Sequence, residues 1–437
     1  MLPVPVPRDI PLPLPADGFY LEPLLIVAFI AHILFVNLTV GGAVYVFLLQ
    51  LWSRRRPDYA VLARAVAQTL TVNKSMAVVL GVAPLLLINV LYTVHFYTAN
   101  ALTGMAWIAL VPVIAGAFVL LYVHKYTWVR LAHRPRLHLA IAGVAVALLL
   151  FVPLVFLANV SLMMMPERWS SVAGLWDAVW LPAVLPRYFH FMSASLILTS
   201  LFGVGYFGRE KFVQQAGFET LTAPNIRRFF YRIAFGTSLG QYVIGPTILL
   251  TLPADGLNTA VLATVLIGAV ISLAPISMMW LELKEPLAHR TRLLEISVLL
   301  TATVLCMAMG RHAYRKIRLA PHQRAIANAT EQWNSDSSQA AFNARLRSEL
   351  EASGRSVGQP IFEANCMACH ARDERLIGPP LTEIANIYAG NPDGIVTWAM
   401  APGKKREGFP QMPPFEVLGK EKLRHVADYI LQTAAHK

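Results

Sequence analysis

The chain has 437 residues, of which 56% are hydrophobic and 14% are charged, and its formal net charge at pH 7 is +12. Soluble globular domains carry about 25% charged residues, so this composition excludes an ordinary soluble protein and indicates a polytopic membrane protein. The basic residues are spread over loops between apolar runs. A nucleic-acid partner is therefore not expected, because it requires a clustered basic face on a soluble module.

Residues 1–20 begin MLPVPVPRDIPLPLPADG, a proline-rich stretch without the charged start and apolar core of a cleavable signal peptide. We expect an extended segment outside the membrane. Residues 21–313 then contain eight apolar runs, each long enough to span a hydrocarbon core of about 30 Å. The predicted spans lie near residues 22–52, 73–98, 103–130, 138–165, 185–208, 229–252, 257–281 and 293–313.

The loops between these spans alternate in charge. Over residues 50–300, one face carries seventeen Lys and Arg, and the other carries two, Arg168 and Arg187. The positive-inside rule assigns the basic face to the cytoplasm, so eight spans place both chain ends outside it. The sequence thus predicts a multi-pass protein of a bacterial inner membrane, surrounded by lipid, with both termini in the periplasm.

Histidines inside the predicted spans are candidates for a functional site, because an ionisable side chain is costly there and neutral histidine is a common haem ligand. Five histidines lie in these spans or at their ends. At a rise of 1.5 Å per residue, His32, His95, His190 and His312 fall in the outer half of the membrane, and His124 lies near the cytoplasmic end. A hydrogen bond to a neighbouring helix is the alternative for each of them. We predict one or two haem b groups, for which the candidate ligands are His32, His95, His190 and His312.

Residues 314–356 lose this hydrophobicity and include the polar stretch NSDSSQ, so we expect a partly helical tether. Beyond it, residues 366–370 read CMACH. Cys366 and Cys369 have the spacing for covalent attachment of one haem c, and His370 is placed to bind its iron. A zinc site would need further ligands, and the remaining cysteine, Cys306, lies alone in an apolar segment. A redox dithiol would require flanking strands, which the sequence does not predict.

A sixth iron ligand is expected from a methionine on a stiff loop downstream. In GFPQMPPFEVL, prolines restrict the backbone on both sides of Met412, which we predict to be this ligand. Met400 is the alternative, but VTWAMAPG reads as the end of a helix, where methionine usually packs.

Residues 357–437 resemble a class I cytochrome c. GQPIFEANCMACH is similar to its first helix and attachment site, GPPL to the following loop, MPPF to the methionine loop and KEKLRHVADYIL to the last helix. The resemblance implies that Tyr429 crosses near Phe362. It also agrees with the predicted topology, because c-type haem is attached outside the cytoplasm.

The membrane part, over residues 20–250, resembles the haem-bearing subunit of cytochrome bd quinol oxidases. The likeness lies in FIAHILFVNLTVGGAVYVFLLQLW and LPRYFHFMSASLILTSLFGVGYF, with the spans between them. In that family the first-span histidine binds a haem of the oxygen site and the fifth-span histidine binds low-spin haem b. The resemblance implies these roles for His32 and His190.

Two departures from the oxidases affect the function. Only PADGLN stands where they have a long quinol loop, and no Asp or Glu lies deep in any predicted span to deliver protons. The sequence therefore predicts an all-α b/c-type cytochrome that transfers electrons between the quinone pool, or a partner redox subunit, and a periplasmic haem c. Soluble periplasmic cytochromes are further expected partners. The alternatives are a terminal oxidase subunit with a fused cytochrome c, and a haem-free membrane anchor.

Overall fold

The computed structural model describes residues 14–284, 292–352, 356–404, 407–408 and 410–435. The chain forms two compact units, Met1–Thr330 and Glu331–Lys437. Every regular element among the described residues is helical, which confirms the all-α prediction. Most of the predicted N-terminal segment, residues 1–13, lies outside the described part.

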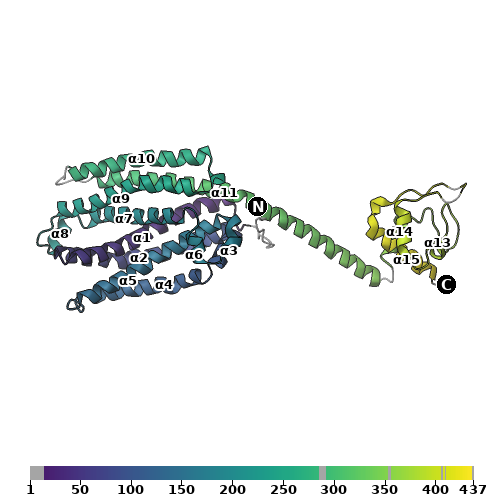
Figure 1. Ribbon diagram of the computed structural model, residues 1–437, viewed down its shortest axis with the longest axis horizontal. Helices are drawn as coiled ribbons and strands as arrows, with labels where there is room; N and C mark the ends of the chain where they lie inside the picture. Colours follow the sequence, from purple (N-terminus) through teal and green to yellow (C-terminus); the bar gives the residue numbers. More distant parts are fainter. Residues whose placement is uncertain (1–13, 285–291, 353–355, 405–406, 409, 436–437) are drawn as a thin grey trace. The chain divides into compact units, whose positions relative to one another are not determined.

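Eight helices of the described chain are long and apolar enough to cross a membrane, as predicted. Seven belong wholly to the first unit, and the eighth runs on toward the second (Figure 1). They are α1 (Gly18–Trp52), α2 (Asp58–Leu91), α4 (Met105–Tyr126), α5 (Pro135–Met163), α7 (Val184–Tyr206), α9 (Ala223–Thr251), α10 (Thr259–Lys284) and α11 (Leu293–Ala352). The chain is therefore a multi-pass membrane protein.

Short helices mark the two ends of this bundle. At one end lies α8 (Glu210–Ala216); at the other lie α3 (Thr93–Thr103) and α6 (Leu175–Val179) (Figure 1). We call these the α8 end and the α6 end. Two 3₁₀ helices, η1 (Pro166–Ser171) and η2 (Ala254–Gly256), also occur in loops of this unit.

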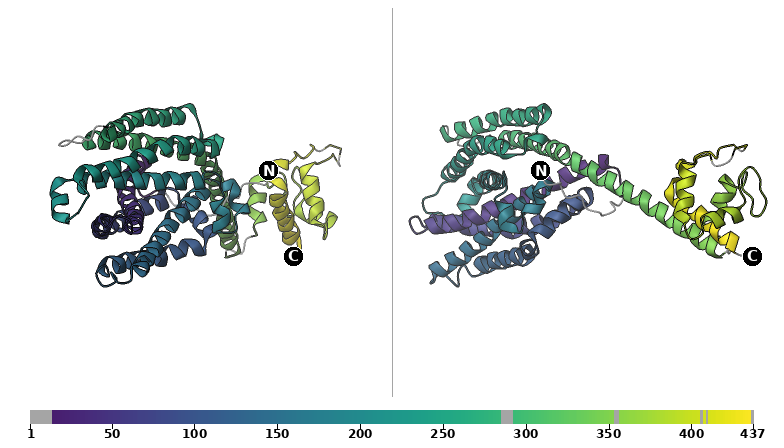
Figure 2. Two further views of the ribbon diagram at one scale, coloured as in Figure 1. Left: turned by 60° about the vertical axis from the view of Figure 1, so that its left-hand side comes forward. Right: turned by 45° about the vertical axis from the view of Figure 1, so that its right-hand side comes forward.

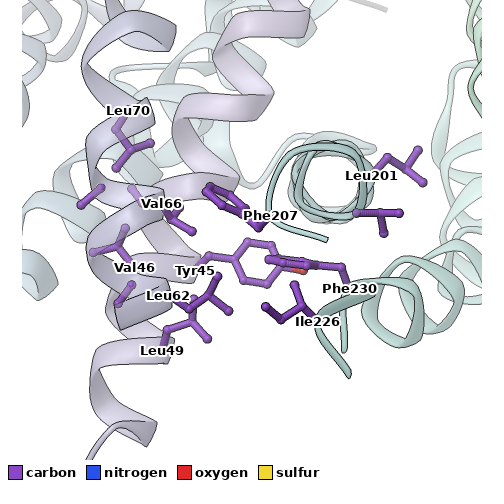
Figure 3. Packing of buried hydrophobic residues seen from close by; sticks show 14 of the residues in the cluster. Tyr45, Val46, Leu49, Leu62, Val66, Leu70, Leu201, Phe207, Ile226 and Phe230 are labelled. Carbon is purple, nitrogen blue, oxygen red and sulfur yellow. The ribbon is translucent and has the colours of Figure 1, made fainter. Parts of the chain in front are cut away.

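The second span differs from the prediction of residues 73–98. Helix α2 begins at Asp58 because Leu62, Val66 and Leu70 recur at helical spacing and are buried against α1, so the polar residues between them do not end the helix. Figure 3 shows these side chains facing Val46 and Leu49, beside a cluster around Tyr45. Helix α2 ends at Leu91, where the non-helical backbone of Tyr92 (φ −133°, ψ 37°) separates it from α3.

Helices α1 and α7 pack closely where Gly41 meets α7. A Cβ at Gly41 would lie 2.4 Å from the carbonyl oxygen of Ser195, so only glycine permits this approach. One turn away, the hydroxyl of Ser195 donates to the side-chain oxygen of Asn37 at 2.9 Å. This contact fixes the register of the two helices.

The predicted tether is helical along most of its length. Helix α11 continues from the membrane span to Ala352, and the boundary between the two units falls within it, after Thr330. Its buried residues Leu319, His322 and Ile326 follow a helical spacing that extends the packed face beyond residue 313.

Beyond the end of α11, the described residues of the second unit form four short α-helices and one 3₁₀ helix, which pack into a small domain (Figure 2). They are α12 (Gly358–Asn365), α13 (Leu381–Ile387), α14 (Pro392–Met400), η3 (Glu416–Leu418) and α15 (Gly419–Ala435). Helix α14 begins at a clear signal, since Asn391 caps it by accepting from Gly394 N–H and Pro392 occupies the first turn.

The first and last helices of this domain cross in close contact. A Cβ at Gly358 would lie 1.9 Å from the carbonyl oxygen of His425, so α12 can approach α15 only with glycine at this position. The rings of Phe362 and Tyr429 lie 5.4 Å apart at the crossing, as the sequence predicted. Phe362 also belongs to the buried core, together with Leu381, Ile395, Val396, Leu423, Val426 and Ile430.

Candidate functional site

The CMACH motif forms a tight turn directly after α12. The N–H of Cys366 donates to Phe362 at 2.7 Å, and the N–H groups of Cys369 and His370 both donate to the carbonyl oxygen of Cys366 at 3.1 Å. The two cysteines are half-buried and form no disulfide. One turn therefore presents two thiols and an imidazole together, which is the arrangement that covalent haem attachment requires.

The pKa of Cys366 differs from that of a redox-active dithiol. Burial, followed by the neighbouring Cys369, raises the pKa of its thiol to about 11. A reactive dithiol depends on a lowered pKa that keeps one sulfur ionised. The site therefore does not have the electrostatics of a thiol–disulfide exchange centre.

The ring of His370 is held with one nitrogen left for a metal. Its Nδ1 lies 2.8 Å from the carbonyl oxygen of Pro379, to which it can donate, so the deprotonated Nε2 becomes the available ligand. Gly378 lies against the ring, because a Cβ there would be 2.2 Å from Cε1 of His370. The backbone around Gly378 is fixed in turn by its N–H, which donates to Cys369 at 2.8 Å.

Met412 lies on an extended segment that is tied to the rest of the domain on both sides. Gln411 donates to the carbonyl oxygen of Pro402 at 2.7 Å, and the N–H of Phe415 donates to Ala399 at 2.9 Å. Met412 is half-buried and packs against the core that contains Phe362. Met400, the last residue of α14, packs against the same core, so the structure keeps both methionines at the site.

The comparisons with known proteins agree with this geometry. Residues 355–430 match the family described as cytochrome c oxidase, cbb3-type, subunit III. Cytochrome c-551 of Pseudomonas denitrificans is 30% identical over 79 residues, which are 17% of this chain and 96% of that protein. Through this domain, the chain belongs to the cytochrome c family. Cytochrome c6 of Cyanidium caldarium is 34% identical over 77 residues, or 18% of this chain and 69% of that protein.

Family membership confirms two predictions at a coarse level. The cytochrome c domain carries haem c, and its activity is electron transfer. Three features fit a covalently bound haem: the thiols and imidazole of the CMACH turn, the contact of Gly378 with the His370 ring, and the segment that carries Met412. These matches cover less than a fifth of the chain and do not extend to the membrane unit.

In the membrane unit, His32 has the same hydrogen-bond arrangement as His370. Its Nδ1 lies 2.9 Å from the carbonyl oxygen of Ala77 on α2, which leaves Nε2 available to a metal. The ring is half-buried against Gly81, where a Cβ would lie 2.8 Å from Cε1 of His32. The α1–α2 interface thus holds His32 in one orientation.

His190 lies at the same depth as His32 but faces other helices. The Asn37–Ser195 contact sets the register of the parallel helices α1 and α7, and each histidine lies five residues, about 7.5 Å, nearer the α6 end. Gln241 of α9 donates to the backbone oxygen of His190 at 3.1 Å. His190 is exposed, whereas His32 is half-buried.

The structure pairs His95 with a residue that the sequence analysis did not consider. Nδ1 of His322 lies 3.0 Å from Nε2 of His95, and both side chains are buried next to Trp169. The predicted end of the last span at residue 313 excludes His322. The spacing of Leu319, His322 and Ile326 was the available signal.

His312 also has protein partners. Its Nε2 lies 3.1 Å from a carboxylate oxygen of Glu22, and its Nδ1 lies 3.4 Å from the guanidinium of Arg315. The ring therefore belongs to a polar network at the α6 end.

Along the axis of the bundle, His124 lies near the α8 end, far from the other candidate histidines. Its side chain is buried and does not reach the lipid surface. Its Nε2 lies 2.8 Å from Oε1 of Gln50, and its ring stacks on His138 at 4.0 Å. Gln50 also contacts Nδ1 of His138 at 2.7 Å. These contacts account for His124 as a structural side chain.

Proposed function

We propose that this protein is a membrane-bound b/c-type cytochrome that transfers electrons between the quinone pool, or a partner redox subunit, and its own haem c. The observation that carries the proposal is the fusion of a cytochrome c domain to an eight-helix membrane bundle in which His32 presents a free Nε2. An anchor would need one span and no fixed imidazole. The bundle and the cytochrome c domain then work as one electron-transfer chain.

In the cytochrome c domain, we assign covalent haem attachment to Cys366 and Cys369, and iron ligation to His370 and Met412. The carbonyl oxygen of Pro379 orients His370, and Gly378 leaves room for its ring. The haem would supply a one-electron couple, and the domain would supply the iron ligands that help to set its potential.

In the membrane unit, we assign haem b ligation to His190 and His32. They correspond to the haem-ligating histidines of the cytochrome bd oxidases that the membrane part resembles. The available Nε2 of His32 and the exposed ring of His190 are both compatible with ligation. His95 and His312 are assigned to the polar pairs with His322 and Glu22.

The charge distribution supports an orientation. The strongly basic loops belong to the α8 end, so we place that end in the cytoplasm and the α6 end in the periplasm of a bacterial inner membrane. Soluble periplasmic cytochromes would then meet the haem c domain on the same side.

The test is reduction of the c-type haem by a quinol in purified full-length protein. The proposal predicts reduction in the wild type, its loss in His190→Ala together with a changed b-type spectrum, and little change in His124→Ala. A wild-type c-type haem that no quinol reduces, with or without added membrane partners, would contradict the proposal. Binding of carbon monoxide by a high-spin haem would favour the oxidase alternative.

A further inference from the structure

Three arginines near the α6 end of the bundle lie close to His190. Arg187 precedes His190 by three residues on α7, so it lies one turn, about 4.5 Å, nearer the α6 end on the same helix face. Arg311 and Arg315 lie one turn apart on α11. Arg311 is about 27 Å along the helix axis from the first residue, Leu293, so both arginines lie toward the α6 end. Val184 of α7 and Tyr314 of α11 belong to one buried cluster, so the stretches that carry these arginines lie in the same part of the bundle.

None of these three arginines has an acidic partner among the described residues. Leu185, two residues before Arg187, and Ala313, between Arg311 and Arg315, pack against the same buried cluster. In the part of the chain that the structure describes, Arg187 donates to the hydroxyl of Ser161 at 3.2 Å, and Arg311 lies over the ring of Phe29 at 5.0 Å. Neither contact neutralises a charge.

Arg315 is the most deeply buried of the three. Its side chain lies over the ring of Tyr92 at 4.6 Å, the residue is 8% exposed, and its Nε has no hydrogen-bond partner within the described ranges. A buried guanidinium with an unsatisfied donor is costly unless an anion reaches it.

The nearby carboxylates are committed elsewhere. Arg318 pairs with both Glu167 and Asp255, and Glu22 pairs with His312 and Lys316. The three arginines therefore form a positive cluster at the edge of the low-dielectric layer, where repulsion between like charges is poorly screened.

His190 and Arg311 are both exposed, so the packed helices do not enclose either of them. On α9, Gly245 lies one turn nearer the α6 end than Gln241, the residue that contacts His190, and a Cβ at Gly245 would meet nothing within 4 Å.

We infer that Arg187, Arg311 and Arg315 form the binding site for the two propionate carboxylates of the haem b that His190 ligates. This inference rests on the proposed function. Propionates leave one edge of the porphyrin, so iron at His190 with that edge toward the α6 end brings two carboxylates to the arginines. Guanidinium groups bind carboxylates through paired hydrogen bonds, and the anions would remove the repulsion within the cluster. A lipid phosphate shares this chemistry, but it would not use the space next to His190.

The test uses full-length protein with Arg187→Gln, Arg311→Gln or Arg315→Gln. Lys316→Gln is the matched control, because it removes the same charge from the adjacent position of α11, where the side chain is exposed and pairs with Glu22. Transfer of haem b to apomyoglobin measures retention, and a redox titration measures the midpoint potential. We expect the three variants to release haem b roughly 10- to 100-fold faster, because each loses charge-assisted hydrogen bonds. We also expect a lower midpoint potential, because less positive charge faces the ferric haem.

Arg187→Lys provides a second test if a glutamine variant fails to fold, since it keeps the charge and should keep the potential close to that of the wild type. Wild-type retention and potential in all three glutamine variants, in a protein that does contain haem b, would overturn the inference and leave the proposed function intact. Loss of bound phospholipid phosphorus without a change in haem b would instead assign the cluster to a lipid, and would also overturn it. A wild type without haem b would refute the proposed function itself.

Discussion

Nδ1 of His322 lies 3.0 Å from Nε2 of His95, and the two rings, 5.0 Å apart, are buried together at the α6 end of the membrane unit. This contact links α3 to α11 and ties the last span to the bundle well beyond residue 313. It also occupies the nitrogen through which His95 would most readily bind iron.

The first prediction follows from this pair. His95→Leu should leave the b-type spectrum unchanged but destabilise the bundle by about 1–3 kcal/mol, because the hydrogen bond between the two buried rings is lost. The double variant His95→Leu, His322→Leu should be less destabilised than this single variant, since neither polar group remains. Thermal unfolding and visible spectra provide the measurements. A shifted b-type spectrum in His95→Leu would show that His95 is a ligand after all.

The second prediction concerns the covalent haem. Replacing Cys366 and Cys369 together with serine should abolish covalently bound haem, because no other thiol has the required spacing, while the membrane unit still inserts. Haem staining after denaturing electrophoresis measures the outcome. A stained band that survives in the double variant would contradict the assignment.

The third prediction separates the two methionines of the cytochrome c domain. Met412→His should keep the haem six-coordinate but lower its reduction potential, since a thioether favours ferrous iron more than an imidazole does. Met400→Leu is the matched control, because Met400 packs against the same core and leucine preserves its volume. Redox titration of the c-type band measures both. A potential that moves only in the Met400 variant would transfer the ligand role to Met400.

How much of this site could be read from the sequence depends on how local the signal is. The turn of Cys366 and His370 was predictable because a short motif determines it, and the Phe362–Tyr429 crossing followed from the resemblance to class I cytochrome c. The carbonyl partner of His32 was not, because Ala77 is 45 residues away and its proximity depends on how α1 packs on α2.

The same reasoning explains the errors at the helix ends. A hydropathy pattern locates an apolar run but does not show that a polar helix continues past it, so the start of α2 at Asp58 and the buried His322 were missed. Whether a histidine has a protein partner is likewise decided by distant residues. For His312 that partner is Glu22, which lies 290 positions earlier in the chain.

The fourth prediction tests the orientation of His32. Gly81→Ala should displace the imidazole, because the new methyl group would overlap the ring at 2.8 Å, and the cost should be about 1–3 kcal/mol. Gly236→Ala is the control, since nothing lies within 4 Å of a Cβ at that position of α9. The b-type spectrum and the thermal unfolding midpoint should change in the first variant only. Equal behaviour of the two variants would argue against a fixed role for the His32 ring.

The fifth prediction tests the topology. Ser170 is an exposed residue at the α6 end and Arg55 an exposed residue between α1 and α2, so a cysteine at either position can react with a membrane-impermeant maleimide. On the charge asymmetry, intact cells should label Ser170→Cys from outside, and Arg55→Cys should react only after lysis. The opposite pattern would reverse the proposed orientation of every span.

The central claim is that the membrane unit binds haem b and works together with the haem c domain. A pyridine haemochrome spectrum of the purified full-length protein tests it most directly, because it counts b-type and c-type haem separately. We predict one c-type haem and at least one b-type haem per chain, the latter reduced in amount or altered in spectrum by His190→Ala. A spectrum with c-type haem alone would contradict the claim and leave the bundle as an anchor for the cytochrome c domain.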